Sequence, residues 1–401
     1  MFADYFDETP VLPEKLSVDT QAVITSSPLD TGKIKTLRKQ IQEICDGKVL
    51  AVPNHEEHIL YENSIYVCTH VFGSSVGART SEVYLWVGAA VSEAAVEDAQ
   101  LFAKKAAKES GGKMMLSRQG KETPSFLEAL GGILITRRGS PASRSSKYVL
   151  CGRRYLGHIA FDEVDFSLAS FCSGFPFLVS TGTGSIILWK GVGCTAEELG
   201  SARLIGSDLG AAGSYDEVQE GHEPASFLAL FTGADPDGPK SMPKSADHWR
   251  LKAGSDKFAA RLFRVEQHQH QPHHARSLAH QVVEVAPFCQ ADLEPEGVFV
   301  LDAFFEVYII VGALTRSQHH AFATALLFAQ EYGILAASLQ DRPFVPVSTV
   351  VLEGFPRDLK AVFRRWDDRF VPTSALMAGK PKRGKSLRTV GLDSAIAAAK
   401  P

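Results

Sequence analysis

Histidine is the residue type in this chain whose spacing comes closest to that of a metal site. Four histidines lie in a segment rich in Gln and Pro, and two more are adjacent on a predicted helix: His268, His270, His273, His274, His319 and His320. Clustered imidazoles can ligate zinc or copper. No cysteine or carboxylate stands at ligand spacing beside the first cluster, so a solvent-exposed loop is the favoured interpretation. The adjacent pair is expected to face solvent or a domain interface.

No other motif predicts catalysis. No Ser, Cys or Asp lies in a recognisable nucleophile motif. The glycine-rich stretches 182–184 and 191–193 lack both phosphate-loop patterns, so they are interpreted as turns. The six cysteines include no Cys-x-x-Cys pair, which argues against structural zinc and predicts reduced intracellular thiols, several of them buried. We therefore predict no enzyme, with a metal-dependent enzyme as a distant alternative that metal analysis would test.

Length and composition limit the number of domains and the kinds of partner that the chain can have. A chain of 401 residues is too long for one ordinary core, and three units of roughly 100–120 residues match the usual domain size. The net charge of −4 provides no global field that would attract nucleic acid or an anionic membrane. No apolar run approaches the roughly 18 residues that span a bilayer, and the acidic N-terminus does not resemble a signal peptide.

One short cassette occurs three times and organises the chain. Each copy is a predicted strand that ends in glycine and runs into a helix: residues 81–88 (SEVYLWVG), 184–191 (GSIILWKG) and 305–312 (FEVYIIVG). After each helix comes a second echo: residues 119–122 (QGKE), 220–223 (EGHE) and 353–356 (EGFP). Self-similarity at this spacing predicts three copies of one structural unit.

The first unit shows the order of elements expected in each copy. It has a predicted opening helix carrying Ile34, Leu37, Ile41 and Ile44, followed by strands at 64–70 and 81–87, the long helix, and later strands at 114–116 and 133–136. Ser92 is the predicted N-cap of the long helix, and Gly111 with Gly112 ends it. Its buried stripe is expected to be Ala95, Ala99, Phe102, Ala103 and Ala106.

The other two units repeat this order. In the second, Thr195 and Glu198 form a predicted capping box at the start of the long helix. In the third, Thr315 is the predicted cap of a strongly apolar helix that ends at Gly333. A shorter helix near residues 125–130, 225–231 and 359–363 can cover the other face of the sheet. The predicted fold class is α+β, each unit being a central mixed sheet between one long and one short helix.

Loop-like composition separates the units. We expect an extended or loosely attached arm at residues 1–30, repeats at 31–140, 148–233 and 247–370, and a basic flexible tail at 371–401. The segments between the repeats are rich in Gly, Pro, Ser and charge, which is typical of linkers. The tail is basic and made of small residues, and a short charged tail is usually only solvated.

The cassette resembles the repeat of the gelsolin/villin superfamily. That repeat has a strand ending in Trp-x-Gly, a helix just after it, and a closing Gly-x-Glu-Pro-x-x-Phe segment; the matching residues are 86–88, 189–191 and 220–227. The third copy has Ile310 in place of the tryptophan. The resemblance covers about residues 32 to 370 and implies three tandem gelsolin-like repeats of the ADF-homology type. It is strongest for the gelsolin-repeat region of filamentous-fungal proteins.

The resemblance implies actin as the partner, through filament capping, severing or side-binding. In the family's monomer-binding repeat, the long helix contacts actin with the face turned away from its own sheet. Here that face reads Glu97, Leu101, Lys104, Lys105 and Lys108, with Leu101 as the expected contact. One exposed leucine is also ordinary for a globular protein, and Lys104 stands where the family tends to be apolar.

The second unit adds an arginine pair. Arg153 and Arg154 resemble the basic start of the family's filament-side or phosphoinositide-binding repeat. Two adjacent arginines could pair with carboxylates or phosphates. A solvated strand end is the simpler interpretation and is favoured.

Calcium is where the chain departs from the resemblance. The family's intradomain site takes an Asp at the start of the central strand and a Glu in the first turn of the long helix, because calcium prefers charged oxygens. The paired positions here hold Asn63 and Ala95, Phe175 and Glu198, and Gly297 and His319. No unit keeps both carboxylates, and Glu198 has a local role in its capping box. We therefore expect weak or no calcium binding and no other cofactor.

Two functions stay open. The first is a non-enzymatic, calcium-independent actin-binding protein of the cytoplasm and cytoskeleton. The alternative is a diverged scaffold that binds a non-actin protein or a membrane-traffic partner, which the loss of carboxylates in all three units favours. Substitution of Leu101 by Asp separates the two, because it can weaken actin binding only where actin binding exists.

Overall fold

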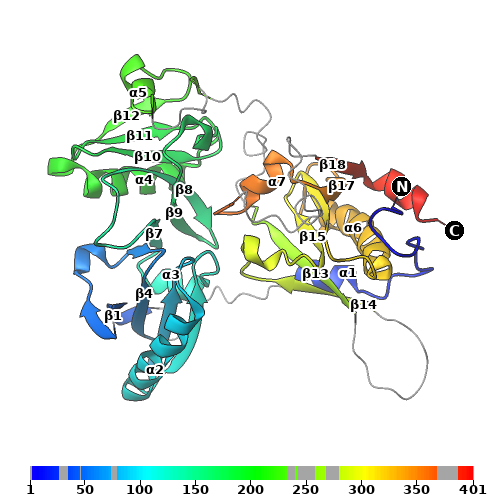
Figure 1. Ribbon diagram of the computed structural model, residues 1–401, viewed down its shortest axis with the longest axis horizontal. Coiled ribbons are helices and arrows are strands. Elements are labelled where there is room, and N and C mark those ends of the chain that lie inside the picture. The colour runs from blue at the N-terminus through cyan, green and yellow to red at the C-terminus, as the bar shows by residue number, and fades with distance from the viewer. Residues whose placement is uncertain are drawn as a thin grey trace. The chain divides into compact units, whose positions relative to one another are not determined.

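The chain divides into two compact units. The computed structural model describes residues 2–26, 35–45, 47–73, 79–233, 240–242, 258–267, 280–367 and 387–400. The two-repeat unit is Leu29–Ala253, and the one-repeat unit combines Met1–Pro28 with Gly254–Pro401. Figure 1 labels their helices and strands.

All three repeats are built on the same five-stranded sheet. The strand orders are β2-β1-β4-β5-β6, β9-β8-β10-β11-β12 and β14-β13-β15-β16-β17. In each sheet the fifth strand pairs parallel to the cassette strand, and the other neighbours pair antiparallel. A parallel step needs a crossover, which the long helix supplies. The fold is therefore the predicted α+β class, with three tandem gelsolin-like repeats.

The first repeat places one helix on each face of its sheet. Its elements are β1 (Lys35–Cys45), β2 (Lys48–Ala51), β4 (Ile65–Gly73), β5 (Arg79–Val87), α2 (Glu93–Ser110), β6 (Lys113–Arg118) and α3 (Pro124–Ala129). The long helix α2 packs Val96, Ala99 and Ala103 against one face. The short helix α3 packs Phe126 and Leu127 against the other. The sequence prediction of a long and a short helix on opposite faces is confirmed.

The ends of α2 follow from its capping residues. Ser92 Oγ accepts a hydrogen bond from the Ala95 backbone N–H at 3.4 Å, and Gly111 ends the helix in the left-handed region at φ 67°. Both caps agree with the prediction. The buried line runs through Val96, Ala99, Ala103 and Ala107, so the predicted inclusion of Ala95 was wrong, since that side chain is exposed.

The predicted opening helix was also wrong. Residues 35–45 form strand β1, which lies between β2 and β4 and pairs with both. Ile41 is buried in the core, whereas Leu37 is exposed. The helical spacing of the apolar residues is a local signal, and the two ladders of strand pairing override it.

The second repeat shares its sheet with the end of the first. Its elements are β8 (Lys147–Tyr155), β9 (His158–Val164), β10 (Pro176–Thr181), β11 (Ile186–Lys190), α4 (Ala196–Leu209), β12 (Asp216–Gln219) and α5 (Ala225–Ala229). Two strands of the first repeat, β7 (Ile133–Arg137) and β3 (Ile59–Tyr61), extend this sheet by parallel pairing beyond β9. Arg137 Nε lies 2.7 Å from Glu163 Oε2, and both side chains are less than 10% exposed. This shared sheet was not predicted.

The third repeat is completed by both ends of the chain. Its elements are β13 (Arg261–Gln267), β14 (His280–Val285), β15 (Val298–Asp302), β16 (Glu306–Val311), α6 (His319–Leu339), β17 (Val347–Glu353) and α7 (Arg357–Val362), joined by α1 (Thr20–Thr25), β18 (Arg388–Gly391) and α8 (Leu392–Ala398). Short 3-10 turns lie at Asn54–Glu56, Leu168–Ser170, Ala211–Gly213 and Gln290–Asp292.

The two chain ends cover α6 and correct two predictions (Figure 1). The rings of Phe2 and Phe6 lie 5.0 and 4.9 Å from the ring of Phe322 on α6. Leu392 and Ile396 of α8 belong to the same core. The expected loose arm is therefore packed, and the last part of the expected flexible tail is strand and helix. Residues 368–386, which hold the basic stretch, lie outside the described part of the chain.

Helix α6 is the most apolar of the three long helices. By length and composition it could cross a membrane, which the sequence analysis did not anticipate. Its side chains Phe322, Leu326 and Ala329 are completely buried against the sheet and the chain ends, as in the core helix of a globular domain. The helix begins at His319, so the predicted cap at Thr315 was wrong: the Thr315 hydroxyl donates to the Gly312 carbonyl at 2.8 Å instead.

The glycine that ends each cassette is required by a close backbone approach. A Cβ added at Gly88, Gly191 or Gly312 would lie less than 3.0 Å from backbone atoms of the segment before the repeat's central strand. Gly88 and Gly312 donate backbone hydrogen bonds to that same segment, at 3.1 Å each. Any larger residue would push the cassette strand away from this contact.

The second echo is explained by a hydrogen bond to the cassette tryptophan, which is buried in the first repeat and partly buried in the second. The indole Nε1 of Trp86 donates to Glu122 Oε1 at 3.0 Å, and that of Trp189 donates to Glu223 Oε1 at 2.8 Å. Backbone N–H groups of the echo glycines donate to the same carboxylates. The third repeat has Ile310 and Pro356 at these positions, so the donor and the acceptor are lost together. A buried carboxylate without its donor would be costly.

Candidate functional site

The outer face of α2 carries the predicted contact residue. Leu101 is 67% exposed, although most large apolar side chains of this repeat are buried. The helix has 3.6 residues per turn, so Leu101 points away from Ala99 and Ala103, which pack on the sheet. The surrounding side chains are also exposed: Glu97, Lys104, Lys105 and Lys108. The structure thus brings the five residues of the predicted outer face together on one surface.

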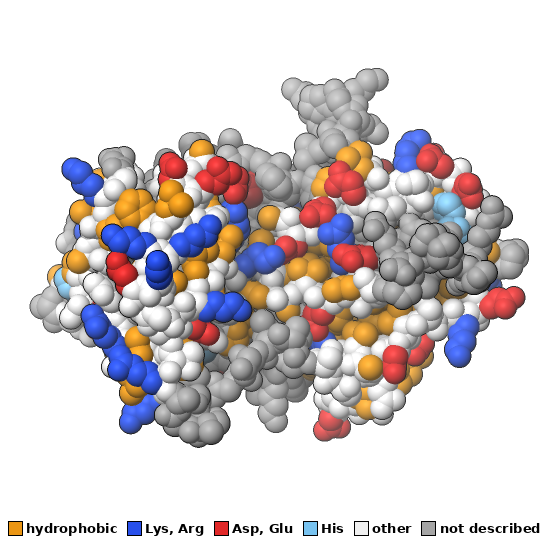
Figure 2. Space-filling model, turned by 90° about the horizontal axis from the view of Figure 1, so that it is seen from below, with side chains coloured by type: hydrophobic (Ala, Val, Ile, Leu, Met, Phe, Trp, Pro, Cys, Tyr) orange, Lys and Arg blue, Asp and Glu red, His pale blue; other side chains and the backbone are white. Residues whose placement is uncertain are grey.

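This surface is rich in cations and poor in internal ion pairs. Lys105 Nζ lies 3.9 Å from Glu109 Oε1 with both side chains strongly exposed, a geometry that contributes little to stability. At the start of the helix, a hydrogen bond from Arg118 lowers the pKa of Glu93. In Figure 2, Lys and Arg side chains lie among exposed hydrophobic ones on the left, where the two-repeat unit is drawn. A partner that presents carboxylates around an apolar side chain would complement such a surface.

The arginine pair does not form one site. Strand β8 places successive side chains on opposite faces. The Arg153 guanidinium lies 4.4 Å from the centre of the Phe175 ring, on the face that holds the aromatic core. Arg154 points toward α4, where its Nε lies 3.7 Å from Glu197 Oε2. One phosphate group therefore cannot be held by both guanidinium groups.

The carboxylate at the start of α4 is engaged by backbone donors. Glu198 is fully buried, and its oxygens accept from the Thr195 N–H at 3.1 Å and from the Arg154 N–H at 2.7 Å. The predicted capping box is confirmed. The other position of the family's calcium site in this repeat holds Phe175, whose apolar ring is 2% exposed. Glu198 therefore acts as a structural link between α4 and β8.

The corresponding positions of the other repeats lack metal-binding geometry. Asn63 and Ala95 are both exposed in the first repeat. In the third, a Cβ at Gly297 would lie less than 3.0 Å from the ring of Phe299. His319 Nε2 lies 3.5 Å from Glu8 Oε2 of the N-terminal segment. No group of three or more His, Cys, Asp or Glu side chains within the described ranges is placed to hold a metal ion.

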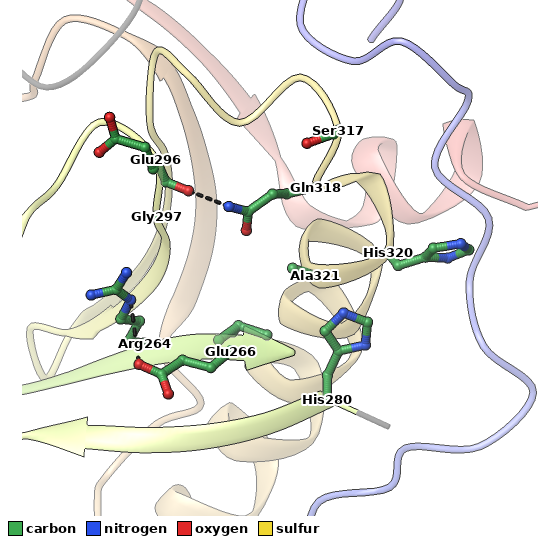
Figure 3. A pocket seen from close by; sticks show the side chains of 10 residues that line it. Arg264, Glu266, His280, Glu296, Gly297, Ser317, Gln318, His320 and Ala321 are labelled. Carbon is green, nitrogen blue, oxygen red and sulfur yellow. Dashed lines mark hydrogen bonds and ion pairs between the residues drawn. The ribbon is translucent and has the colours of Figure 1, made fainter. Parts of the chain in front are cut away.

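A pocket lies beside α6 in the third repeat (Figure 3). It measures about 500 Å³, and Gln318 closes one side by donating to the Glu296 carbonyl. Arg264 reaches into it and pairs with Glu266 at 3.4 Å and Glu294 at 2.8 Å. The Arg264 guanidinium offsets one of these two carboxylate charges.

The adjacent histidines of α6 and two buried cysteines lie in structural surroundings. The rings of His319 and His320 are 4.2 Å apart, with His319 against the N-terminal segment and His320 exposed as expected. The predicted cluster at 268–274 lies outside the described residues. Burial raises the pKa of the Cys68 and Cys151 thiols to about 12, which leaves them protonated and unreactive at neutral pH.

Comparisons with known proteins give relatives along most of the chain. A family profile described as "Domain of unknown function (DUF7904)" matches residues 40–138, within the first repeat. Gelsolin of Drosophila melanogaster is 26% identical over 323 residues, 80% of this chain. Advillin of Mus musculus is 30% identical over 206 residues (51% of this chain), and the protein flightless-1 homolog of Mus musculus is 24% identical over 329 residues (77%). The chain spans 38%, 22% and 25% of the lengths of these three relatives.

A solved structure was also matched. It is a chain of a complex between Thorarchaeota 2DGel3 and rabbit actin, 18% identical, covering 48% of this chain and 99% of its own length. Its TM-score of 0.20 is too low to carry an argument. The chain is thus similar to gelsolin and the flightless-1 homolog along most of its length, and to advillin over half of it.

Proposed function

We propose that this protein binds actin through the outer face of α2. The observation that carries the proposal is Leu101, 67% exposed at the centre of a charged helix face that no described part of the chain covers. Similarity to gelsolin and advillin makes actin the first partner to test. The protein acts without catalysis and is associated with the cytoskeleton.

The proposed mode is filament capping or side-binding, with severing as a further mode, and it is independent of calcium. The support for calcium independence is chemical. Of the six predicted calcium positions only Glu198 is a carboxylate, and two backbone N–H donors already occupy its oxygens. Calcium prefers several charged oxygens in one site. A phosphoinositide site built from Arg153 and Arg154 together is not proposed, because they lie on opposite faces of β8.

The second candidate is a scaffold that binds a non-actin protein or a membrane-traffic partner. One observation favours it: Lys104 occupies the middle of the face that is more apolar in the family. A cation at that place changes which surface α2 can accept.

Co-sedimentation with actin filaments tests the proposal. We expect the full chain to pellet with filaments at about 10 µM protein, equally with calcium and with a chelator. A pyrene-actin assembly assay then distinguishes capping from side-binding. Absence of binding at this concentration in both conditions would reject the actin proposal and favour the scaffold. Binding that needs calcium would reject the calcium-independent mode.

A further inference from the structure

Histidine is concentrated in the third repeat. Seven of the thirteen histidines of the sequence lie between residues 268 and 320. Of the three that fall within the described part of the chain, His319 is turned toward the N-terminal segment, where its Nε2 lies 3.5 Å from Glu8 Oε2. The other two, His280 and His320, line the same pocket beside α6 (Figure 3). Imidazole side chains that share a pocket are candidate ligands for a metal ion.

Strand pairing and the start of α6 bring His280 and His320 together. His280 is the first residue of β14 and lies opposite Gln267 of β13. Side chains alternate along a strand, so His280 shares a face with Val282, which packs against the α6 core. His320 lies in the first turn of α6. The centres of the two rings are 6.5 Å apart, although the residues are distant in the sequence.

This separation of the rings suits one shared metal ion. A metal lies about 2.0–2.1 Å from a ligating imidazole nitrogen, so two rings that bind the same ion have centres about 5–6 Å apart. A small rotation of the exposed His320 side chain closes the difference. The two histidines therefore offer a site with two nitrogen ligands, in which water completes the coordination.

The charges around the pocket favour a cation. Glu266 and Glu296 line the pocket, and Glu294 Oε2 lies 2.8 Å from Nη1 of the lining residue Arg264. Three carboxylates against one guanidinium leave these surroundings negative. The start of a helix such as α6 contributes only about half a positive charge. The field at the two imidazoles therefore attracts a positive ion.

We propose that His280 and His320 bind one divalent metal ion of the zinc, nickel and copper class. Imidazole nitrogen suits these metals, whereas calcium and magnesium prefer oxygen ligands. The ion clamps the edge strand β14 to the start of α6. The N-terminal segment lies beside this clamp, because the Ser17 hydroxyl donates to the His280 carbonyl at 3.1 Å. The site shares no residue with the outer face of α2 and does not depend on actin binding.

Zinc titration of the full chain tests the proposal. The four histidines at 268–274 could also bind zinc, so the titration uses a background variant in which each of them is replaced by Gln. Calorimetry with zinc chloride is expected to show one site with a Kd of about 10–100 µM. Zinc at about ten times this Kd should raise the thermal midpoint by about 2–4 °C, and calcium at the same concentration should not. No saturable zinc binding by the background variant would overturn the proposal.

Two further substitutions locate the ion. His280→Gln and His320→Gln, each added to the background variant, should weaken zinc binding at least about tenfold and remove the thermal shift. His222→Gln, at an exposed histidine of the second repeat, is the matched control and should leave both unchanged. Circular dichroism checks that each variant is folded. Zinc binding that survives either His280→Gln or His320→Gln would contradict a site shared by the two imidazoles.

Discussion

The long helices of the first and third repeats hold the same place in the same sheet but have different surroundings. Helix α2 buries one line of small side chains and exposes Leu101 among charges. Helix α6 is buried on nearly all sides over its first three turns, between its own sheet and the two chain ends. Phe322, for example, contacts Phe2 and Phe6. The comparison shows that one scaffold leaves the outer face of its long helix exposed in one copy and buries the helix as a core element in another.

The difference has a simple origin in composition. A helix that is apolar on all sides must be covered, and here residues 2–26 and 387–400 supply the cover. A helix with one apolar line and a charged outer face needs no cover. Removing the contacts that cover α6 should therefore lower the stability of the fold. Changing the exposed residue of α2 should instead weaken binding and leave stability nearly unchanged.

The largest expected effect is on the covered helix. Phe322→Ala removes a fully buried ring and two ring contacts, and it should lower the free energy of unfolding of its unit by about 3–5 kcal/mol. Leu101→Ala on α2 is the matched control and should change it by less than about 0.5 kcal/mol. Denaturant unfolding of the full chain measures both. Equal losses for the two variants would contradict the contrast between covered and exposed helices.

A smaller effect separates the repeats that keep the Trp–Glu hydrogen bond from the one that lost it. Trp86→Phe leaves the buried carboxylate of Glu122 without its indole donor and should cost about 1–3 kcal/mol of unfolding free energy. Ile310→Val at the same place in the third repeat should cost only about 0.5–1.5 kcal/mol, because no polar group loses its partner. A Trp86→Phe loss below about 0.5 kcal/mol would contradict a contribution of this hydrogen bond.

The stability contributed by the Tyr5 contact, which holds the N-terminal segment, should fall at alkaline pH. The Tyr5 hydroxyl donates to Glu353 Oε1 at 2.7 Å and accepts from Arg388 Nη1 at 2.9 Å. Burial, with the neighbouring Glu353, raises the pKa of Tyr5 to about 12. The ordinary pKa of a tyrosine is about 10, so the folded protein holds this proton more tightly than the unfolded chain does. The contact therefore contributes its full stability below pH 10 and loses it as the pH rises through about 12.

Tyr5→Phe isolates this contact. The variant should be about 1 kcal/mol less stable at neutral pH, and the difference from the unchanged protein should shrink between pH 10 and 12. Thermal unfolding across this pH range is the measurement. A difference that stays constant with pH would mean that Tyr5 ionisation is not coupled to packing of the segment.

The architecture was predictable from the cassette because the signals were local. The Ser92 and Thr195 caps and the helix stripes depend on neighbouring residues. Strand β1, read as a helix, is defined by two partner strands far away in the sequence. The cover of α6 joins residues more than three hundred positions apart, such as Tyr5 and Glu353, and no local pattern contains that information.

The candidate site was predictable only in part. Helical spacing placed Leu101 and its charged neighbours correctly on the outer face of α2. Adjacency in sequence suggested that Arg153 and Arg154 act together, but strand geometry separates them. The partner of each cassette tryptophan could have been found by noticing that Trp and the echo glutamate are lost together in the third copy.

Actin co-sedimentation of Leu101→Asp tests the central claim most directly. The variant should be as stable as the unchanged protein within about 0.5 kcal/mol, because the side chain is exposed, and should bind filaments at least about tenfold more weakly. Leu204→Asp is the matched control, since Leu204 is 55% exposed on α4 of the second repeat, and it should bind normally. Binding by Leu101→Asp equal to that of the unchanged protein would contradict the assignment of the outer face of α2 as the actin contact.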